Sequence, residues 1–201
     1  MISSFILHSD SKSVNYEEAQ YLILLLEAFI NLTFSDYGIE TLLGKEAIKN
    51  FTKILDNAEI KQALDDKWQK IAELSLRVLG NMSINHEGKQ ECIDEKVIER
   101  SHAFLIDEPD RSYEDALNTS LILMSCSIHL EGKNQIVHAD HHGSPYIIKT
   151  MIQRLECDDE EFGDLRKNLK VALINVAELP LGFEKITECL INKIQILDEV
   201  F

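Results

Sequence analysis

Apolar residues recur with the spacing of an α-helix in four stretches of this chain. Their members follow the i, i+3, i+4, i+7 pattern that marks one face of a helix. The stretches run from Leu22 to Phe29, Trp68 to Met82, Leu117 to Ile128 and Leu165 to Val176. Apolar residues also occupy other faces of these stretches, as expected of a helix packed between neighbours. In no segment do apolar and polar residues alternate one by one between turn residues, so strands are not expected.

A similar eight-residue segment closes each of the four helical stretches. Aligned without gaps, the segments read NLTFSDYG (31–38), NMSINHEG (81–88), SCSIHLEG (125–132) and NVAELPLG (175–182). Their final glycines therefore lie 50, 44 and 50 residues apart. Because glycine adopts positive φ without a steric cost, we expect each of these glycines to end a helix. Further helical stretches follow each glycine, so that one unit holds two or three helices.

A repeat of 44 to 50 residues with two or three helices is typical of armadillo and HEAT units. Such units bury their apolar faces only by stacking on one another. We therefore predict an all-α, armadillo/HEAT-like right-handed α-solenoid of about four repeats. The predicted organisation is a flexible lead-in at 1–15 followed by units at 16–64, 65–112, 113–161 and 162–201.

The charge balance limits the classes of partner. The chain of 201 residues carries 35 acidic and 20 basic residues, a formal net charge of −15. Such a surface repels nucleic-acid phosphates and anionic lipid headgroups, so neither is an expected partner. A basic segment of another protein suits it better, although acidity also serves solubility alone. The longest apolar run, Tyr21 to Leu32, contains Glu27 and is too short for a bilayer, which needs about 20 residues.

No enzyme signature is present in the sequence. The chain lacks the phosphate-binding, dinucleotide-binding, zinc-protease and nucleophile-elbow motifs, so we expect no catalytic residue, cofactor or small-molecule substrate. A histidine-rich segment holds His138, Asp140, His141 and His142, with His129 nearby. A tetrahedral zinc site needs about four converging ligands, and the adjacent His141 and His142 do not easily share one ion. We therefore expect a solvated loop and no metal there.

Residues at the ends of the helical stretches resemble the armadillo-repeat family. That family closes its third helix with a pattern like A-L-x-N-L-S, and this chain has VLGNMS at 78–83 and ALINVA at 172–177. The EGK loops at 87–89 and 131–133 and the final NVAELPLG resemble one group in particular, the radial spoke head 14 homologue family of motile cilia. The resemblance covers roughly residues 70 to 190. One departure is that Glu46 and Lys96 stand where most armadillo repeats have a glycine before the second helix.

The resemblance implies a set of groove residues on the third helices. In peptide-binding armadillo proteins the third-helix asparagine bonds the peptide backbone, because an amide offers both a donor and an acceptor. The matching candidates, together with the neighbouring Arg77, are Asn31, Asn81, Ser125 and Asn175. The alternative is that these side chains cap or bridge turns within the repeat. The tryptophans of nuclear-import grooves are absent, since Glu27, Arg77, Leu121 and Val171 occupy their positions.

Apolar side chains near both termini lack a covering helix in this scheme. They are Phe5, Ile6 and Leu7 at one end and Ile194, Leu197 and Phe201 at the other, and we expect them to contact partner proteins. The resemblance implies a non-catalytic structural scaffold of the ciliary axoneme, a radial spoke subunit in the cytoplasm and cytoskeleton that contacts other spoke proteins. The alternative is a soluble adaptor that binds an extended peptide in a concave groove.

Overall fold

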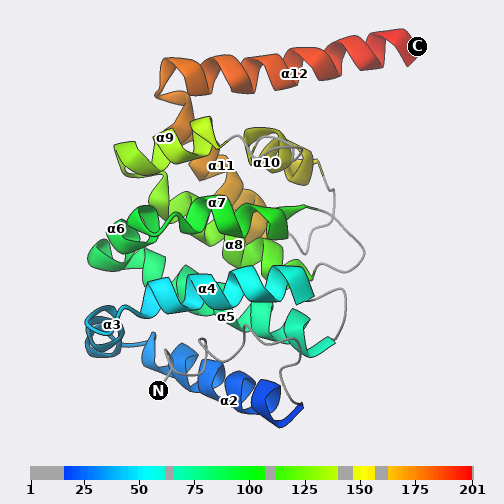
Figure 1. Ribbon diagram of the computed structural model, residues 1–201. Helices are drawn as coiled ribbons and strands as arrows, with labels where there is room; N and C mark the ends of the chain where they lie inside the picture. Colours follow the sequence, from blue (N-terminus) through cyan, green and yellow to red (C-terminus); the bar gives the residue numbers. More distant parts are fainter. Residues whose placement is uncertain (1–15, 62–65, 107–111, 140–146, 157–162, 201) are drawn as a thin grey trace.

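The computed structural model describes residues 16–61, 66–106, 112–139, 147–156 and 163–200, and these ranges contain helices and turns but no strand (Figure 1). The helices are α2 (Tyr16–Leu32), α3 (Asp36–Leu43), α4 (Ala47–Lys61), α5 (Asp66–Ile84), α6 (His86–Asp94), α7 (Val97–Ser101), the 3-10 helix η2 (His102–Leu105), α8 (Tyr113–Cys126), α9 (Leu130–His138), α10 (Ile147–Leu155), α11 (Gly163–Ala177) and α12 (Pro180–Val200).

Equivalent helices of successive units pack side by side. The long helices α2, α5, α8 and α11 form one row, which we call the third-helix row. The short helices α3, α6 and α9, followed by α12, form the first-helix row, and α4, α7 and α10 with η2 form the second-helix row. First-row, second-row and third-row helices thus follow one another along the chain. α2 lies at one end of the stack and α12 at the other (Figure 1). This stacking confirms the predicted all-α solenoid.

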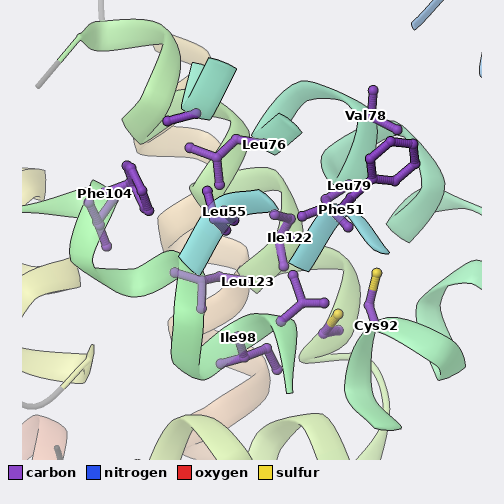
Figure 2. Packing of buried hydrophobic residues seen from close by; sticks show 14 of the residues in the cluster. Phe51, Leu55, Leu76, Val78, Leu79, Cys92, Ile98, Phe104, Ile122 and Leu123 are labelled. Carbon is purple, nitrogen blue, oxygen red and sulfur yellow. The ribbon is translucent and has the colours of Figure 1, made fainter. Parts of the chain in front are cut away.

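The core runs continuously from one unit to the next. Figure 2 shows Phe51 of α4 beside Leu79 of α5, with Ile122 and Leu123 of α8 close by. All four side chains are buried, and the ring of Phe29 on α2 meets that of Phe51 edge to face at 5.4 Å between centroids. The central helices α5 and α8 are buried on more than one side, as their apolar pattern indicated, whereas the end helices α2 and α11 each bury a single stripe.

The repeated glycines have a different cause from the one that the sequence suggested. Each is the third residue of a first-row helix, and none has positive φ. A Cβ atom at Gly88 would lie only 2.2 Å from the carbonyl oxygen of Met82, and the corresponding distances at the other three glycines are 2.0 to 2.2 Å. The expectation that these glycines end a helix at positive φ is wrong. They are required because each first helix crosses closely over the end of the preceding third helix.

Positive φ occurs instead at two residues with side chains. Glu46 has φ of 52° just before α4, and Lys96 has φ of 55° just before α7. Both residues stand where the armadillo-repeat pattern has a glycine before the second helix. For a residue with a Cβ atom this conformation costs roughly 1–2 kcal/mol. A residue other than glycine at these two positions thus strains the backbone of the turns before α4 and α7.

The central helix α8 buries small residues. Its closely packed side includes Ala116, Thr119 and Ser120, while Leu117, Leu121 and Met124 are only half-buried. α8 lies between α5 and α11, where a Cβ on Gly80 would come within 3.5 Å of the Asn118 carbonyl oxygen. Small side chains therefore allow the close approach of the helices. The apolar stripe by which α8 is recognisable in the sequence lies mainly on its open side.

Of the boundaries between units expected from the sequence, one lies within the described residues. The boundary between 112 and 113 coincides with Ser112, which caps α8 through a reciprocal pair of hydrogen bonds with Asp115. The boundaries at 64/65 and 161/162, like the lead-in at 1–15, lie outside the described residues.

Candidate protein-interaction surface

Hydrogen bonds between side chains connect neighbouring helices of the third-helix row. The Asn81 Nδ2 donates to Thr33 Oγ1 at 2.8 Å, and the Asn175 Nδ2 donates to Ser127 Oγ at 3.0 Å. Both bonds cross from one repeat to the preceding one, 48 residues earlier in the chain. Two of the four candidate groove residues thus bridge consecutive repeats through their amide groups.

The other two candidate positions differ in their surroundings. Ser125 is only 3% exposed and has no amide to donate. Asn31 is exposed on α2, at the end of the row. A further bridge that sequence reasoning missed joins Asn168 Nδ2 to Ser120 Oγ at 3.1 Å. It lies seven residues before the Asn175–Ser127 bond on both helices, so the signal was an asparagine and a serine repeated at heptad spacing.

The surface of the third-helix row changes along the stack. The positions held by tryptophan in import grooves are Glu27, Arg77, Leu121 and Val171, in stack order. Glu27 and Arg77 are exposed, Leu121 is half-buried and Val171 is exposed. At this position the row is therefore charged on α2 and α5 and apolar on α8 and α11.

One edge of the stack carries exposed apolar side chains at the same position in three consecutive repeats. Phe34 is 71% exposed, and Ile84 and Ile128 are each 59% exposed. Each lies where a third-row helix gives way to a first-row helix, along the edge formed by α3, α6 and α9 (Figure 1). We call these three residues the edge row. They are the fourth residues of the aligned eight-residue segments. The sequence therefore showed that an apolar residue recurs at this position, but it did not show that the side chain is exposed.

Residues next to the edge row come close together between repeats. His86 lies two residues after Ile84, His129 directly follows Ile128, and their rings lie 5.7 Å apart between centroids. At its first position, Phe34 is adjacent to Thr33, which accepts the inter-repeat bond described above. In the fourth repeat the position is held by Glu178, whose carboxylate pairs with Lys133. The apolar edge therefore spans three repeats and ends in a charged residue.

Acidic groups lie close to this edge. Asp36, Glu87 and Glu131 are exposed in the first turns of α3, α6 and α9. No lysine or arginine occurs in any of the four aligned segments. Farther along α6, burial raises the pKa of Glu91, and the nearby carboxylates of Glu95, Asp94 and Glu46 raise it further. An exposed carboxylate therefore lies two or three residues after the edge-row position in each of its three repeats.

The two buried thiols are suited to packing and not to chemistry. Burial raises the pKa of Cys126 to about 12 and raises the pKa of Cys92 well above its ordinary value. A thiol is nucleophilic only as the thiolate. Both side chains are fully buried in the core, so they act there as small apolar groups.

The expected terminal contacts lie mostly beyond what the structure describes. Phe5, Ile6, Leu7 and Phe201 are outside the described residues, and Ile194 and Leu197 belong to α12 without a description of their side chains. Other apolar side chains at both ends of the stack are exposed: Tyr21 and Leu24 on α2, and Phe183, Leu190 and Ile191 on α12.

The described ranges cover the histidine-rich segment only in part. Asp140, His141 and His142 lie outside these ranges, whereas His129 and His138 lie within them. Among the described residues no three histidine, cysteine or acidic side chains are grouped as metal ligands. None of the described helices combines the length and the apolar character needed to traverse a bilayer.

These stacked three-helix units form an armadillo-type α-solenoid. Among solved structures, one of the computationally designed armadillo repeat proteins for modular peptide recognition matches with a TM-score of 0.68 and 16% identity, covering 94% of this chain and 68% of that one. A second designed armadillo repeat protein matches with a TM-score of 0.65 and 16% identity, covering 94% and 70%. A third, in complex with the peptide (KR)4, matches with a TM-score of 0.65 and 15% identity, covering 94% and 68%. No protein-family model and no curated protein matches the sequence.

Proposed function

We propose that this chain is a non-catalytic scaffold that binds other proteins on the surface of its repeat stack. The observation that carries the proposal is the edge row, in which Phe34, Ile84 and Ile128 expose apolar surface at one position of successive repeats. Single exposed apolar residues are common, but apolar residues exposed at the same position of successive repeats favour an interaction site. The exposed apolar residues of α2 and α12 add to the surface available to partners.

In its finer form, the proposal places the scaffold in a radial spoke of the ciliary axoneme, where it contacts neighbouring spoke proteins. This part rests on the EGK loops at 87–89 and 131–133 and on the NVAELPLG segment. The repeated inter-helix bonds, such as Asn81 to Thr33, favour a stack that keeps its shape under load. A rigid solenoid of this kind suits a structural role between larger components.

The test is affinity purification of the tagged chain from ciliated cells, with quantitative mass spectrometry of the proteins that co-purify. The proposal expects other radial spoke subunits in near-stoichiometric amounts. Recovery of soluble signalling or cargo proteins without axonemal proteins would defeat the ciliary part and leave the scaffold. Recovery of the chain alone, under conditions that preserve other complexes, would defeat both.

A second candidate function is a soluble adaptor for an extended basic peptide bound along the third-helix row. It is favoured by the net charge of −15 and by the (KR)4 peptide that one structural neighbour binds. Titration of labelled (KR)4 into the wild-type chain tests it, with Asn81→Ala and Asn175→Ala as groove variants. An adaptor should lose affinity in both variants, whereas a scaffold that binds elsewhere should bind weakly and equally in all three proteins. Because both amides also bridge repeats, Asn134→Ala on the exposed surface of α9 is the matched control.

A further inference from the structure

We propose that the edge row binds an amphipathic α-helix of a partner protein, with apolar residues every seven positions and lysine or arginine beside them. This inference rests on the proposed scaffold function and specifies the chemistry of its partner. It follows from the spacing of Phe34, Ile84 and Ile128, from their exposure and from the charges around them.

The spacing of the edge row selects a helix. Packed helices lie about 8–10 Å apart, so equivalent residues at the ends of adjacent third-row helices recur at about that interval. The Asn81–Thr33 bond of 2.8 Å joins the ends of α2 and α5, and the His86 and His129 rings, which lie just beyond the ends of α5 and α8, are 5.7 Å apart between centroids. Along an α-helix, residues seven positions apart lie on one face and are separated by about 10.5 Å.

An extended segment fits the same spacing poorly. In a strand the side chains on one face recur about every 6.8 Å, and the residue about 10 Å away points to the opposite face. A strand could therefore place a side chain on one edge-row position but not on the next. Of the two regular conformations, only the helix matches three successive positions of the edge row.

The charges select the flanks of that helix. Asp36, Glu87 and Glu131 are exposed beside the edge row, one in each repeat. The aligned segments contain no lysine or arginine; Lys89 and Lys133 follow two of them, but Lys89 is buried and Lys133 pairs with Glu178. Acidic residues in the first turn of a helix are also stabilised by the helix dipole, but they keep their negative charge. A partner helix with basic residues next to its apolar stripe complements both features of the edge.

The probe is a synthetic, fluorescently labelled 22-residue alanine-based helix with leucine at positions 4, 11 and 18 and lysines beside them. The control peptide has the same composition, with its three leucines moved to three different sides of the helix. Fluorescence anisotropy with the full chain should show at least about tenfold tighter binding of the seven-residue-spaced peptide, because burial of each large apolar side chain contributes strongly to affinity. Equal affinity of the two peptides would mean attraction by charge alone and would overturn the proposal.

Two protein variants locate the binding. Ile84→Ser changes an exposed residue at the end of α5 and should weaken the seven-residue-spaced peptide about tenfold. Ile174→Ser changes a similarly exposed isoleucine on α11, outside the edge row, and as the matched control it should change the affinity less than about twofold. Equal affinity of wild type and Ile84→Ser, or an Ile174→Ser effect as large as that of Ile84→Ser, would overturn the assignment to the edge row.

The same variant separates this inference from the scaffold proposal. If the wild-type chain recovers protein partners from cells and Ile84→Ser loses them, the edge row is the binding surface. If Ile84→Ser retains every partner, the scaffold stands and the edge row is overturned. If the wild-type chain recovers none, the scaffold proposal itself fails.

Discussion

Replacement of Gly88 by alanine tests why glycine recurs at the start of the first helices. The added Cβ would lie 2.2 Å from the Met82 carbonyl oxygen, whereas an ordinary contact between carbon and oxygen is about 3.4 Å. The oxygen belongs to the backbone, so it cannot rotate away, and α6 must move by about 1 Å relative to α5. That shift disturbs the cap of α6, where Asn85 Oδ1 accepts hydrogen bonds from Glu87 N at 2.9 Å and Gly88 N at 3.2 Å.

The free-energy cost can be worked out from these contacts. Overpacking of a close contact costs about 1–3 kcal/mol, and loss of an N-cap costs about 1 kcal/mol. The intrinsic helix preference of alanine over glycine returns about 1 kcal/mol. Gly88→Ala should therefore lower the free energy of unfolding by about 1–3 kcal/mol.

Gly163→Ala is the matched control, because it is a glycine in the first turn of a helix with nothing within 4 Å of an added Cβ. It should leave stability unchanged or raise it by up to about 1 kcal/mol. The assay is urea unfolding followed by circular dichroism at 222 nm, a wavelength that reports helix content. A Gly88→Ala protein as stable as Gly163→Ala would refute the argument that close helix approach selects this glycine.

Three further predictions concern single sites. Lys96→Gly should raise the free energy of unfolding by about 0.5–1 kcal/mol, because glycine relieves the positive φ but gains entropy in the unfolded chain; a less stable variant in thermal unfolding would contradict the strain argument. Asn175→Ala should lower the free energy of unfolding by about 1 kcal/mol, because the bond to Ser127 is lost. Its control, Asn134→Ala at an exposed position of α9, should leave the free energy of unfolding unchanged. Equal stability of the two variants in urea unfolding would show that the inter-repeat bond does not stabilise the stack. With its pKa raised to about 12, Cys126 should resist alkylation by iodoacetamide at pH 8.5 until the chain unfolds; peptide mapping by mass spectrometry that finds it labelled in the native protein would show that this part of the core opens.

Several features of the fold follow from the sequence alone. The helical spacing of apolar residues and the recurrence of the segments at 31–38, 81–88, 125–132 and 175–182 predicted a stack of helical repeats. Repeats are predictable because each unit buries its apolar face only against the next unit, so the same contacts impose the same residue types at a fixed period. The unusual residues Glu46 and Lys96 also marked, in the sequence, the turns that the structure shows to be strained.

The partners of individual side chains depended on the tertiary structure. The sequence aligned Asn81 with Asn175, but their bonds to Thr33 and Ser127 join residues 48 positions apart and exist only because neighbouring helices stack in register. The cause of the Gly88 repeat was likewise hidden, since the atom that excludes a side chain belongs to another helix.

Exposure was the other property that only the folded chain decided. An isoleucine such as Ile84 carries no mark in the sequence that distinguishes a core position from a surface one, and it reads as part of the same apolar pattern as the buried Leu79. Its 59% exposure results from its place at the edge of the stack, where no helix of the described chain covers it. The sequence by itself thus determined the helices and their repetition, because these depend on local spacing and period. The tertiary structure decided which apolar positions stayed uncovered, because burial is set by the neighbours that packing brings together.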